Sequence, residues 1–183
     1  YETQLSEIAH ELESAGIDVE KRLEFTPKLK DSVKRVSKEE HCDAVLLPNP
    51  TEHMERILAP VKDLKEVENL VFCISSFIGG DINNVTILHM IKSKEEEKDA
   101  KGMMDKVGDM LLDKDIDPDI LDLEVTVSKD CTSGIIHKAR EHDVVILRGD
   151  RDSLWNTLFE DVPAKVSNKT GKPVIVVLRE EDK

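Results

Sequence analysis

Two arginines and a serine lie close together in the last quarter of the chain. Arg148, Arg151 and Ser153 carry guanidinium and hydroxyl groups, which are donors that proteins use to bind anions. The same arginines could instead pair with the neighbouring acids Asp150 and Asp152, in contacts that contribute little at a surface. Pairing with these acids is the favoured interpretation, and recognition of an anion is the alternative.

The other residues that could do chemistry show no spacing typical of a catalytic or metal site. The six histidines include no HExxH pattern, and we expect His89, on an apolar strand pattern, to be a hydrogen-bonded core residue. The three cysteines, Cys42, Cys73 and Cys131, lie far apart without a CxxC pair, so we expect small core residues in a reducing compartment. No nucleophile lies near a base in any recognisable pattern. The sequence therefore predicts no catalytic residue, no metal site and no enzyme.

The charge balance excludes some partners. A net charge of −13, with 39 acidic against 26 basic residues, argues against nucleic acid as a ligand. No apolar run approaches the roughly 20 residues that span a bilayer, and no signal-like segment begins the chain. We therefore expect a cytoplasmic domain that does not insert into a membrane. Because the chain begins at Tyr1 within a helical pattern, we expect a piece of something longer.

Two stretches of the sequence resemble each other about a hundred residues apart. Residues 17–47 align with residues 116–147: each has an acidic and apolar segment, a helical pattern, a Glu-His pair, and an aspartate, Asp43 or Asp143, that opens an apolar run. Self-similarity of this kind indicates that one β-α-β unit occurs twice. We expect the two halves to be pseudo-equivalent.

Helical and strand patterns alternate along the chain. The expected helices cover residues 2–13, 27–41, 65–78, a long acidic stretch that a capping box of Ser93 and Glu96 begins, 130–142 and 162–169. The expected strands cover residues 17–26, 43–47, 55–61, 84–91, 121–128, 144–147 and 173–178. This alternation predicts an α/β fold with a doubly wound parallel sheet and sites at the carboxyl ends of the strands. We expect a five-stranded parallel sheet in the second half, with residues 57–61 parallel to residues 144–147.

Several segments, in the right order and at the right spacing, resemble the universal stress protein family. They are Ile57–Val61, Val85–Met90, Asp143–Gly149, Asp161–Val166 and Gly171–Val177. The resemblance implies that residues 55–183 form one complete domain and that residues 1–54 form the latter part of another, without its first strands.

The resemblance also implies a nucleotide loop, G-x2-G-x9-G-[ST], whose backbone amides hold phosphates. Gly149 matches the first glycine of that pattern. Asp152 stands at the second glycine, and Glu160 and Asp161 replace the terminal Gly-Ser pair in a loop about two residues shorter. Carboxylates would then lie where phosphates bind, and Asp161 is well placed to cap the following helix. The ATP loop is therefore expected to be lost.

The adenine end of the pattern is altered as well. The family's aspartate after the first strand falls at Lys62, and Asp63 comes one place late. The candidate ligand-binding positions are Ala59, Lys62, Asp63, Gly149, Arg151 and Ser153. ATP and AMP remain conceivable ligands, but the sequence disfavours both, and no cofactor is expected.

These features together predict a non-enzymatic regulatory or interaction module. The resemblance permits a fusion to a membrane transporter, and the alternative is a universal stress protein that binds adenine nucleotides through an altered loop. Residues 173–178 would form an apolar edge strand whose partner is either the second copy within the chain or another chain. The first half has no counterpart of this strand, which favours another chain, so we expect a homodimer. Trp155, Leu158 and Phe159 would either form a partner-binding patch or pack beneath the sheet edge.

Overall fold

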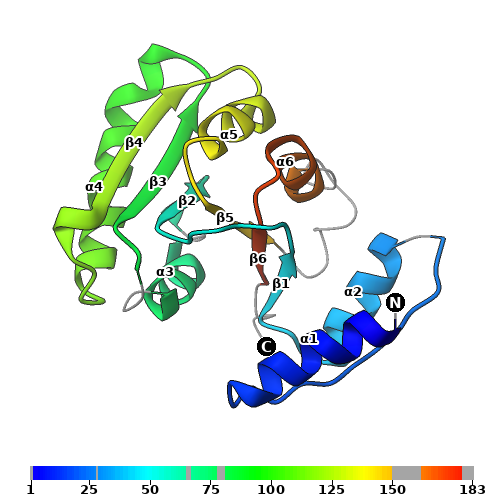
Figure 1. The fold of residues 1–183 in the computed structure, drawn as a ribbon. Coiled ribbons are helices and arrows are strands. Elements are labelled where there is room, and N and C mark those ends of the chain that lie inside the picture. Colours follow the sequence, from blue (N-terminus) through cyan, green and yellow to red (C-terminus); the bar gives the residue numbers. More distant parts are fainter. Residues whose placement is uncertain (1, 28, 65–66, 78–80, 150–161, 179–183) are drawn as a thin grey trace. The chain divides into compact units, whose positions relative to one another are not determined.

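The computed structural model describes residues 2–27, 29–64, 67–77, 81–149 and 162–178 (Figure 1). Its contacts divide the chain into two compact units, Tyr1–Val36 and Ser37–Lys183. The second unit contains the whole sheet.

The first unit consists of a helix and an irregular segment that leads into a second helix. Helix α1, Glu2–Ser14, ends where the Ile17 N–H donates to the Leu12 carbonyl, and Gly16 between them has a φ of 83°. Only glycine adopts such a backbone without strain, so the sequence located this end correctly. Helix α2, Leu29–Glu39, follows.

The strand predicted over residues 17–26 is wrong. These residues have no regular structure. Glu24 instead forms ion pairs with Arg22 at 2.8 Å and with Arg35 at 2.7 Å, and the Phe25 side chain is 91% exposed. A strand needs a neighbour to satisfy its backbone, and no strand in the described part of the chain pairs here.

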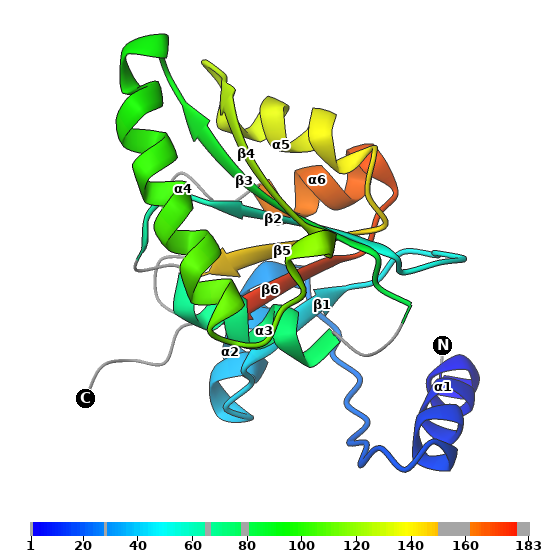
Figure 2. The ribbon, with the colours of Figure 1, turned by 90° about the vertical axis from the view of Figure 1, so that its left-hand side faces the viewer.

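The second unit is built on a six-stranded sheet in the order β1-β6-β5-β2-β3-β4 (Figure 2). The strands are β1 (Ala44–Leu47), β2 (Arg56–Val61), β3 (Asn84–Ile91), β4 (Leu121–Val127), β5 (Val144–Gly149) and β6 (Val174–Leu178). Strands β2 to β6 pair in parallel, and β2 lies between β3 and β5. The predicted α/β fold and the parallel pairing of β2 with β5 are confirmed.

Helices cover both faces of this sheet, and each face has its own core. The helices are α3 (Val67–Phe77), α4 (Glu97–Leu112), α5 (Cys131–Ala139) and α6 (Val162–Thr170), with 3-10 turns at Lys94–Glu96 and Pro118–Ile120. Ile57, Ala59 and Val61 of β2 pack on the face with α3 and α4. Leu58 packs on the other face with α5 and α6. Because successive side chains of a strand point to opposite faces, a central strand buried on both sides is apolar throughout.

The capping box predicted at the start of α4 does not form, because the Ser93 side chain makes no hydrogen bond to a backbone N–H of the following turn. The Ser93 hydroxyl lies 3.4 Å from a Glu96 carboxylate oxygen, and the other oxygen accepts from the Lys92 N–H rather than from that of Ser93. Residues Lys94–Glu96 form a 3-10 turn first, and α4 begins at Glu97. The Glu96 N–H donates to the Ser93 carbonyl within this turn instead.

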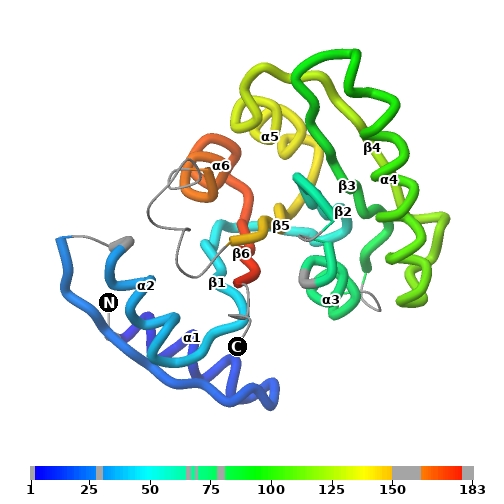
Figure 3. Tube along the Cα trace, turned by 180° about the vertical axis from the view of Figure 1, so that it is seen from behind, coloured from blue at the N-terminus to red at the C-terminus, as the bar shows by residue number. Residues whose placement is uncertain are grey.

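Strand β1 covers the outer edge of β6 from within the same chain. It lies beside β6 (Figure 3) and runs antiparallel to it, with Val45 opposite Val176. Its side chains alternate between exposed and half-buried, so the buried strand predicted over residues 43–47 is an edge strand instead. The preference for another chain as the partner of residues 173–178 is therefore wrong, because residues from the predicted first half fill that edge.

Asn49 holds the segment after β1 against α6 and the turn that leads from α6 to β6. Its Nδ2 donates to Ser167 Oγ at 2.6 Å and to the Lys172 carbonyl at 3.0 Å. Pro48 and Pro50 flank it, and proline restricts the backbone on either side. The connection from β1 to β2 is thus anchored beside the strand that β1 covers.

A buried histidine links α5 to the central sheet. His142 is 1% exposed, with Nδ1 2.9 Å from the Lys138 carbonyl and Nε2 2.9 Å from Thr86 Oγ1. Burial lowers the pKa of His142 below its ordinary value of 6.5, and the charges of Arg56 and Lys138 act in the same direction. Folding therefore favours the neutral imidazole.

We expect the stability of the fold to decrease as the pH falls below about 6.5. The unfolded chain then binds a proton at this position that the folded chain does not, which costs at most ~1.4 kcal/mol per pH unit. Urea unfolding between pH 8 and pH 5 should show this slope, and His142→Gln should flatten it. His137→Gln, which changes an exposed histidine of α5, should retain it. An equal slope in all three proteins would show that other groups cause the pH dependence.

Candidate functional site: a crevice between two strand ends

The order of the strands reverses beside β2. The chain passes from β2 to β3 and β4 on one side, and then to β5 and β6 on the other. In open parallel sheets the crevice for a ligand lies outside the carboxyl ends of the strands at such a reversal. The candidate site is therefore the edge where β2 and β5 end.

Pro60 explains why β2 and β5 part toward that edge. The two strands are in register only at Ile57 with Val144 and at Leu58 with Val145, whereas β2 remains paired with β3 as far as Val61. The Asp143 N–H donates to the Arg56 carbonyl, and backbone groups two residues apart point the same way. Pro60 therefore faces β5, where it has no N–H to donate.

Three of the sequence-predicted ligand residues lie at this end of the two strands. Lys62 and Asp63 follow β2 directly, and both are exposed. Gly149 is buried and ends β5. Ala59 is fully buried, and its side chain packs in the core with α3 and α4. Lys62, Asp63 and Gly149 thus lie at the ends of adjacent strands, whereas Ala59 is part of the hydrophobic core.

The remaining sequence-predicted positions lie outside the described residues. They are Arg151 and Ser153, the acids Asp150, Asp152, Glu160 and Asp161, and the apolar residues Trp155, Leu158 and Phe159. Arg148, the last residue before Gly149, is half-buried. The predictions made for the loop after β5 therefore remain predictions.

Asp143 ties the opposite, amino ends of the same two strands together. Its Oδ2 accepts from the backbone N–H of Glu55 at 3.1 Å and of Arg56 at 3.0 Å, and the Lys172 ammonium lies 3.9 Å from Oδ1. One carboxylate therefore satisfies two backbone donors that precede β2 or begin it. The strands are held at their amino ends and separate at their carboxyl ends.

We expect Asp143→Ala to lower the free energy of unfolding by about 2 kcal/mol, because it leaves two backbone donors without their acceptor. Asp43 is a matched control, since it holds the same place in the sequence repeat and its side chain is exposed. Asp43→Ala should change stability by less than ~0.5 kcal/mol. Chemical denaturation measures both, and equal losses would contradict a special role for Asp143.

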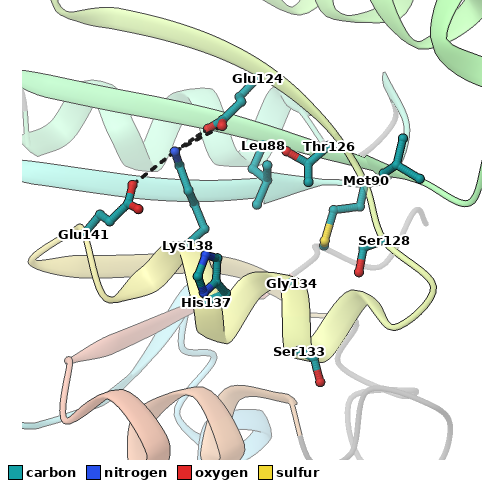
Figure 4. A pocket seen from close by; sticks show the side chains of 11 residues that line it. Leu88, Met90, Glu124, Thr126, Ser128, Ser133, Gly134, His137, Lys138 and Glu141 are labelled. Atoms are coloured by element: carbon teal, nitrogen blue, oxygen red, sulfur yellow. Dashed lines mark hydrogen bonds and ion pairs between the residues drawn. The ribbon is translucent and has the colours of Figure 1, made fainter. Parts of the chain in front are cut away.

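A second hollow, which sequence reasoning missed, lies between β4 and α5 (Figure 4). Its volume is about 500 Å³. The Lys138 ammonium lies 2.7 Å from one carboxylate oxygen of Glu124 and 3.1 Å from the other, and 3.2 Å from Glu141. The hydrogen bond with Glu124 is the main reason that the pKa of Lys138 is raised; burial opposes it, and the hydrogen bond with Glu141 adds a smaller increase. Lys138 and Glu141 are only three residues apart in the sequence, whereas Glu124 of β4 joins them only when α5 packs beside the sheet.

The described residues contain neither a cluster of metal-ligand side chains nor a helix that could cross a membrane. No group of three or more potential ligand side chains among them could hold a metal ion, and none of their helices is long and apolar enough to cross a membrane. Cys42 and Cys73 are half-buried, and burial raises the pKa of the Cys73 thiol. Cys131 is exposed, so the prediction that all three cysteines are core residues is wrong for this one.

The fold and the crevice together define a doubly wound α/β protein whose strand order reverses beside β2. No family model matches the chain, and no curated protein matches its sequence. Among solved structures, a universal stress protein from Archaeoglobus fulgidus aligns with 100% of this chain and 77% of its own, at 14% identity and a TM-score of 0.61.

Two further universal stress proteins were solved with a nucleotide. One, from Archaeoglobus fulgidus in complex with dAMP, matches 69% of this chain and 99% of its own at 16% identity and a TM-score of 0.51. The other, in complex with cAMP, matches 67% of this chain and 96% of its own at 11% identity and a TM-score of 0.52. The chain has the universal stress protein fold.

Proposed function

We propose that this chain is a non-enzymatic, universal-stress-type regulatory or interaction module that has lost the usual ATP loop. The observation that carries the proposal is the sequence that follows the end of β5. Gly149 is retained there, whereas Asp152, Glu160 and Asp161 stand where the family pattern has glycine, glycine and serine. A phosphate group would meet carboxylates in place of bare amides.

The described part of the crevice agrees with this proposal. Lys62 stands at the position of the family's aspartate, so a lysine ammonium replaces a carboxylate that could accept hydrogen bonds. Lys62 and Asp63 are both exposed, and exposed opposite charges contribute little binding energy in water. The adenine end therefore lacks the acceptor at its expected position.

Titration calorimetry with ATP and with AMP tests this proposal. We expect no binding tighter than about 1 mM, which corresponds to roughly −4 kcal/mol. In addition, the chain purified under native conditions should carry no bound nucleotide. Micromolar affinity, or a nucleotide that copurifies, would overturn the proposal.

The second candidate function is adenine-nucleotide binding through an altered loop. The observation that favours it is that β2 and β5 separate at Pro60. Folds of this class bind ligands in a crevice of this kind. Universal stress proteins of the same fold were solved with dAMP and cAMP. In this case Arg148 and Arg151 would supply the positive charge for the phosphates, and Arg151→Gln should abolish the affinity that calorimetry detects.

The proposed module works in the cytosol, either as a free protein or as part of a longer chain with a membrane transporter. The gene sequence upstream of Tyr1 tests the second arrangement, since transporter segments there would support it. The predicted homodimer also remains a proposal. Because β1 covers the outer edge of β6, such a dimer needs another surface, and light scattering across the micromolar range tests it.

A further inference from the structure

Strand β4 ends the sheet on the side opposite β1, and its outer edge has no strand beside it in the described part of the chain. The Ser128 N–H donates to the Ile91 carbonyl of β3 at 2.8 Å. Because backbone groups alternate along a strand, Leu123, Val125 and Val127 direct their N–H and C=O groups away from β3. This edge therefore offers three donors and three acceptors to an added strand.

The hollow between β4 and α5 adjoins this edge (Figure 4). Glu124, Thr126 and Ser128 of β4 line one side of it, and Leu88 and Met90 of β3 also line it. Figure 4 shows these β4 side chains on the face toward α5. Every second side chain of a strand added beside β4 would point to the same face, so those side chains would lie next to the hollow.

The other face of the edge is apolar. Leu123 is 36% exposed and Val127 is 48% exposed. Leu123 points toward α4, since its Cδ1 would lie 2.9 Å from a Cβ placed on Gly108. The alternate side chains of an added strand would cover these two residues, and burial of apolar surface would favour apolar side chains at those positions.

The charge around this edge selects the kind of partner. Asp117, Asp119 and Asp122 are exposed on or just before β4, and Glu124 follows within the strand. Lys138 is already paired with Glu124 and Glu141. The edge therefore repels a second copy of this chain, whose net charge is −13, and attracts a basic segment.

We propose that the outer edge of β4 and the adjoining hollow bind an extended basic segment of another protein, which adds to the sheet as a further strand. Lysine or arginine side chains of the segment lie beside Glu124 and Glu141, and alternate apolar side chains cover Leu123 and Val127. The inference rests on the proposed interaction role and names its partner, but it does not depend on the state of the crevice between β2 and β5.

A synthetic peptide that alternates lysine with valine tests this proposal on the full chain. We expect the peptide to bind at least about tenfold, or ~1.4 kcal/mol, more tightly than two relatives of equal length. One relative is N-methylated at the backbone nitrogens that would face β4, and the other has glutamate in place of lysine. Fluorescence anisotropy measures the affinities, and hydrogen exchange should slow at the amides of Leu123, Val125 and Val127.

A matched pair of variants separates local charge from net charge. Asp122→Asn with Glu124→Gln should weaken binding about tenfold, whereas Asp105→Asn with Asp109→Asn, on exposed positions of α4, should leave it unchanged. Equal affinity for the N-methylated peptide, equal effects of the two double variants, or no binding up to about 1 mM would overturn the proposal. Titration of the same protein with ATP is a separate readout, so failure here leaves the proposed loss of nucleotide binding untouched.

Discussion

Replacement of three acids in the loop after β5 is expected to raise the affinity for ATP about 100-fold. The variant combines Asp152→Gly, Glu160→Gly and Asp161→Ser, which restores the glycines and the serine of the family pattern. Each carboxylate within several ångströms of a triphosphate costs on the order of 1 kcal/mol at a surface-like dielectric constant. Removal of three such charges would therefore gain ~3 kcal/mol, or roughly two decades in Kd. Titration calorimetry of the variant and the unchanged chain measures the difference.

The control for this variant removes the same number of charges elsewhere. Asp105→Asn, Asp109→Asn and Asp113→Asn change exposed residues in α4 and directly after it, so net charge changes equally without any change in the loop. This control should leave the affinity for ATP where it was. If the affinity for ATP rises as much in the control as in the loop variant, general repulsion by the acidic chain is the obstacle. If the affinity rises in neither variant, the loop carboxylates are not the reason that ATP fails to bind.

A proline at Val45 is expected to detach β1 and to uncover the edge of β6. The Leu178 N–H donates to the Asp43 carbonyl at 2.7 Å, and residues two apart along β1 point the same way. The Val45 N–H therefore faces β6, where Val45 lies opposite the buried Val176. Val45→Pro removes this donor and should lower the free energy of unfolding by about 2–3 kcal/mol. The uncovered edge should then make the protein associate with itself.

Leu46→Pro is the matched control for Val45→Pro. Leu46 is 56% exposed, and its backbone N–H points away from β6, so proline there removes no bond of the ladder. A proline at position 46 also favours an extended backbone at the preceding residue, Val45, which already lies in a strand. We expect this control to stay as dispersed as the unchanged chain and to lose less than ~1 kcal/mol. Urea denaturation and light scattering test both variants, and the same stability and mass for the two would show that β1 does not protect the edge.

The sequence was most informative about the central strands. Ile57–Val61, Val85–Ile91 and Val144–Leu147 were all predicted correctly, because a strand buried on both faces requires a continuous apolar run. The end of α1 at Gly16 was predictable for a similarly local reason, since its φ of 83° suits glycine. The alternation of elements also predicted that sites lie at the carboxyl ends of the strands, whereas the particular positions after β2 and β5 came from the family resemblance.

The sequence was least informative where a segment depends on its neighbours. Residues 17–26 and residues 43–47 both have apolar residues and a place in the repeat, yet only Ala44–Leu47 forms a strand. The difference is the edge of β6, which satisfies the backbone of β1. Apolar pattern alone cannot show whether such an edge is within reach.

The sequence by itself determined the alternation of helices and strands, the parallel sheet and the glycine at the end of β5, because each depends on residues close together in the chain. Only the tertiary structure decided that β1 covers β6, that Pro60 faces β5, and that Glu124 of β4 meets Lys138 of α5 beside a sheet edge that no described strand covers. These arrangements join residues far apart in the chain, and the packing of whole elements, rather than any local preference, brings them together.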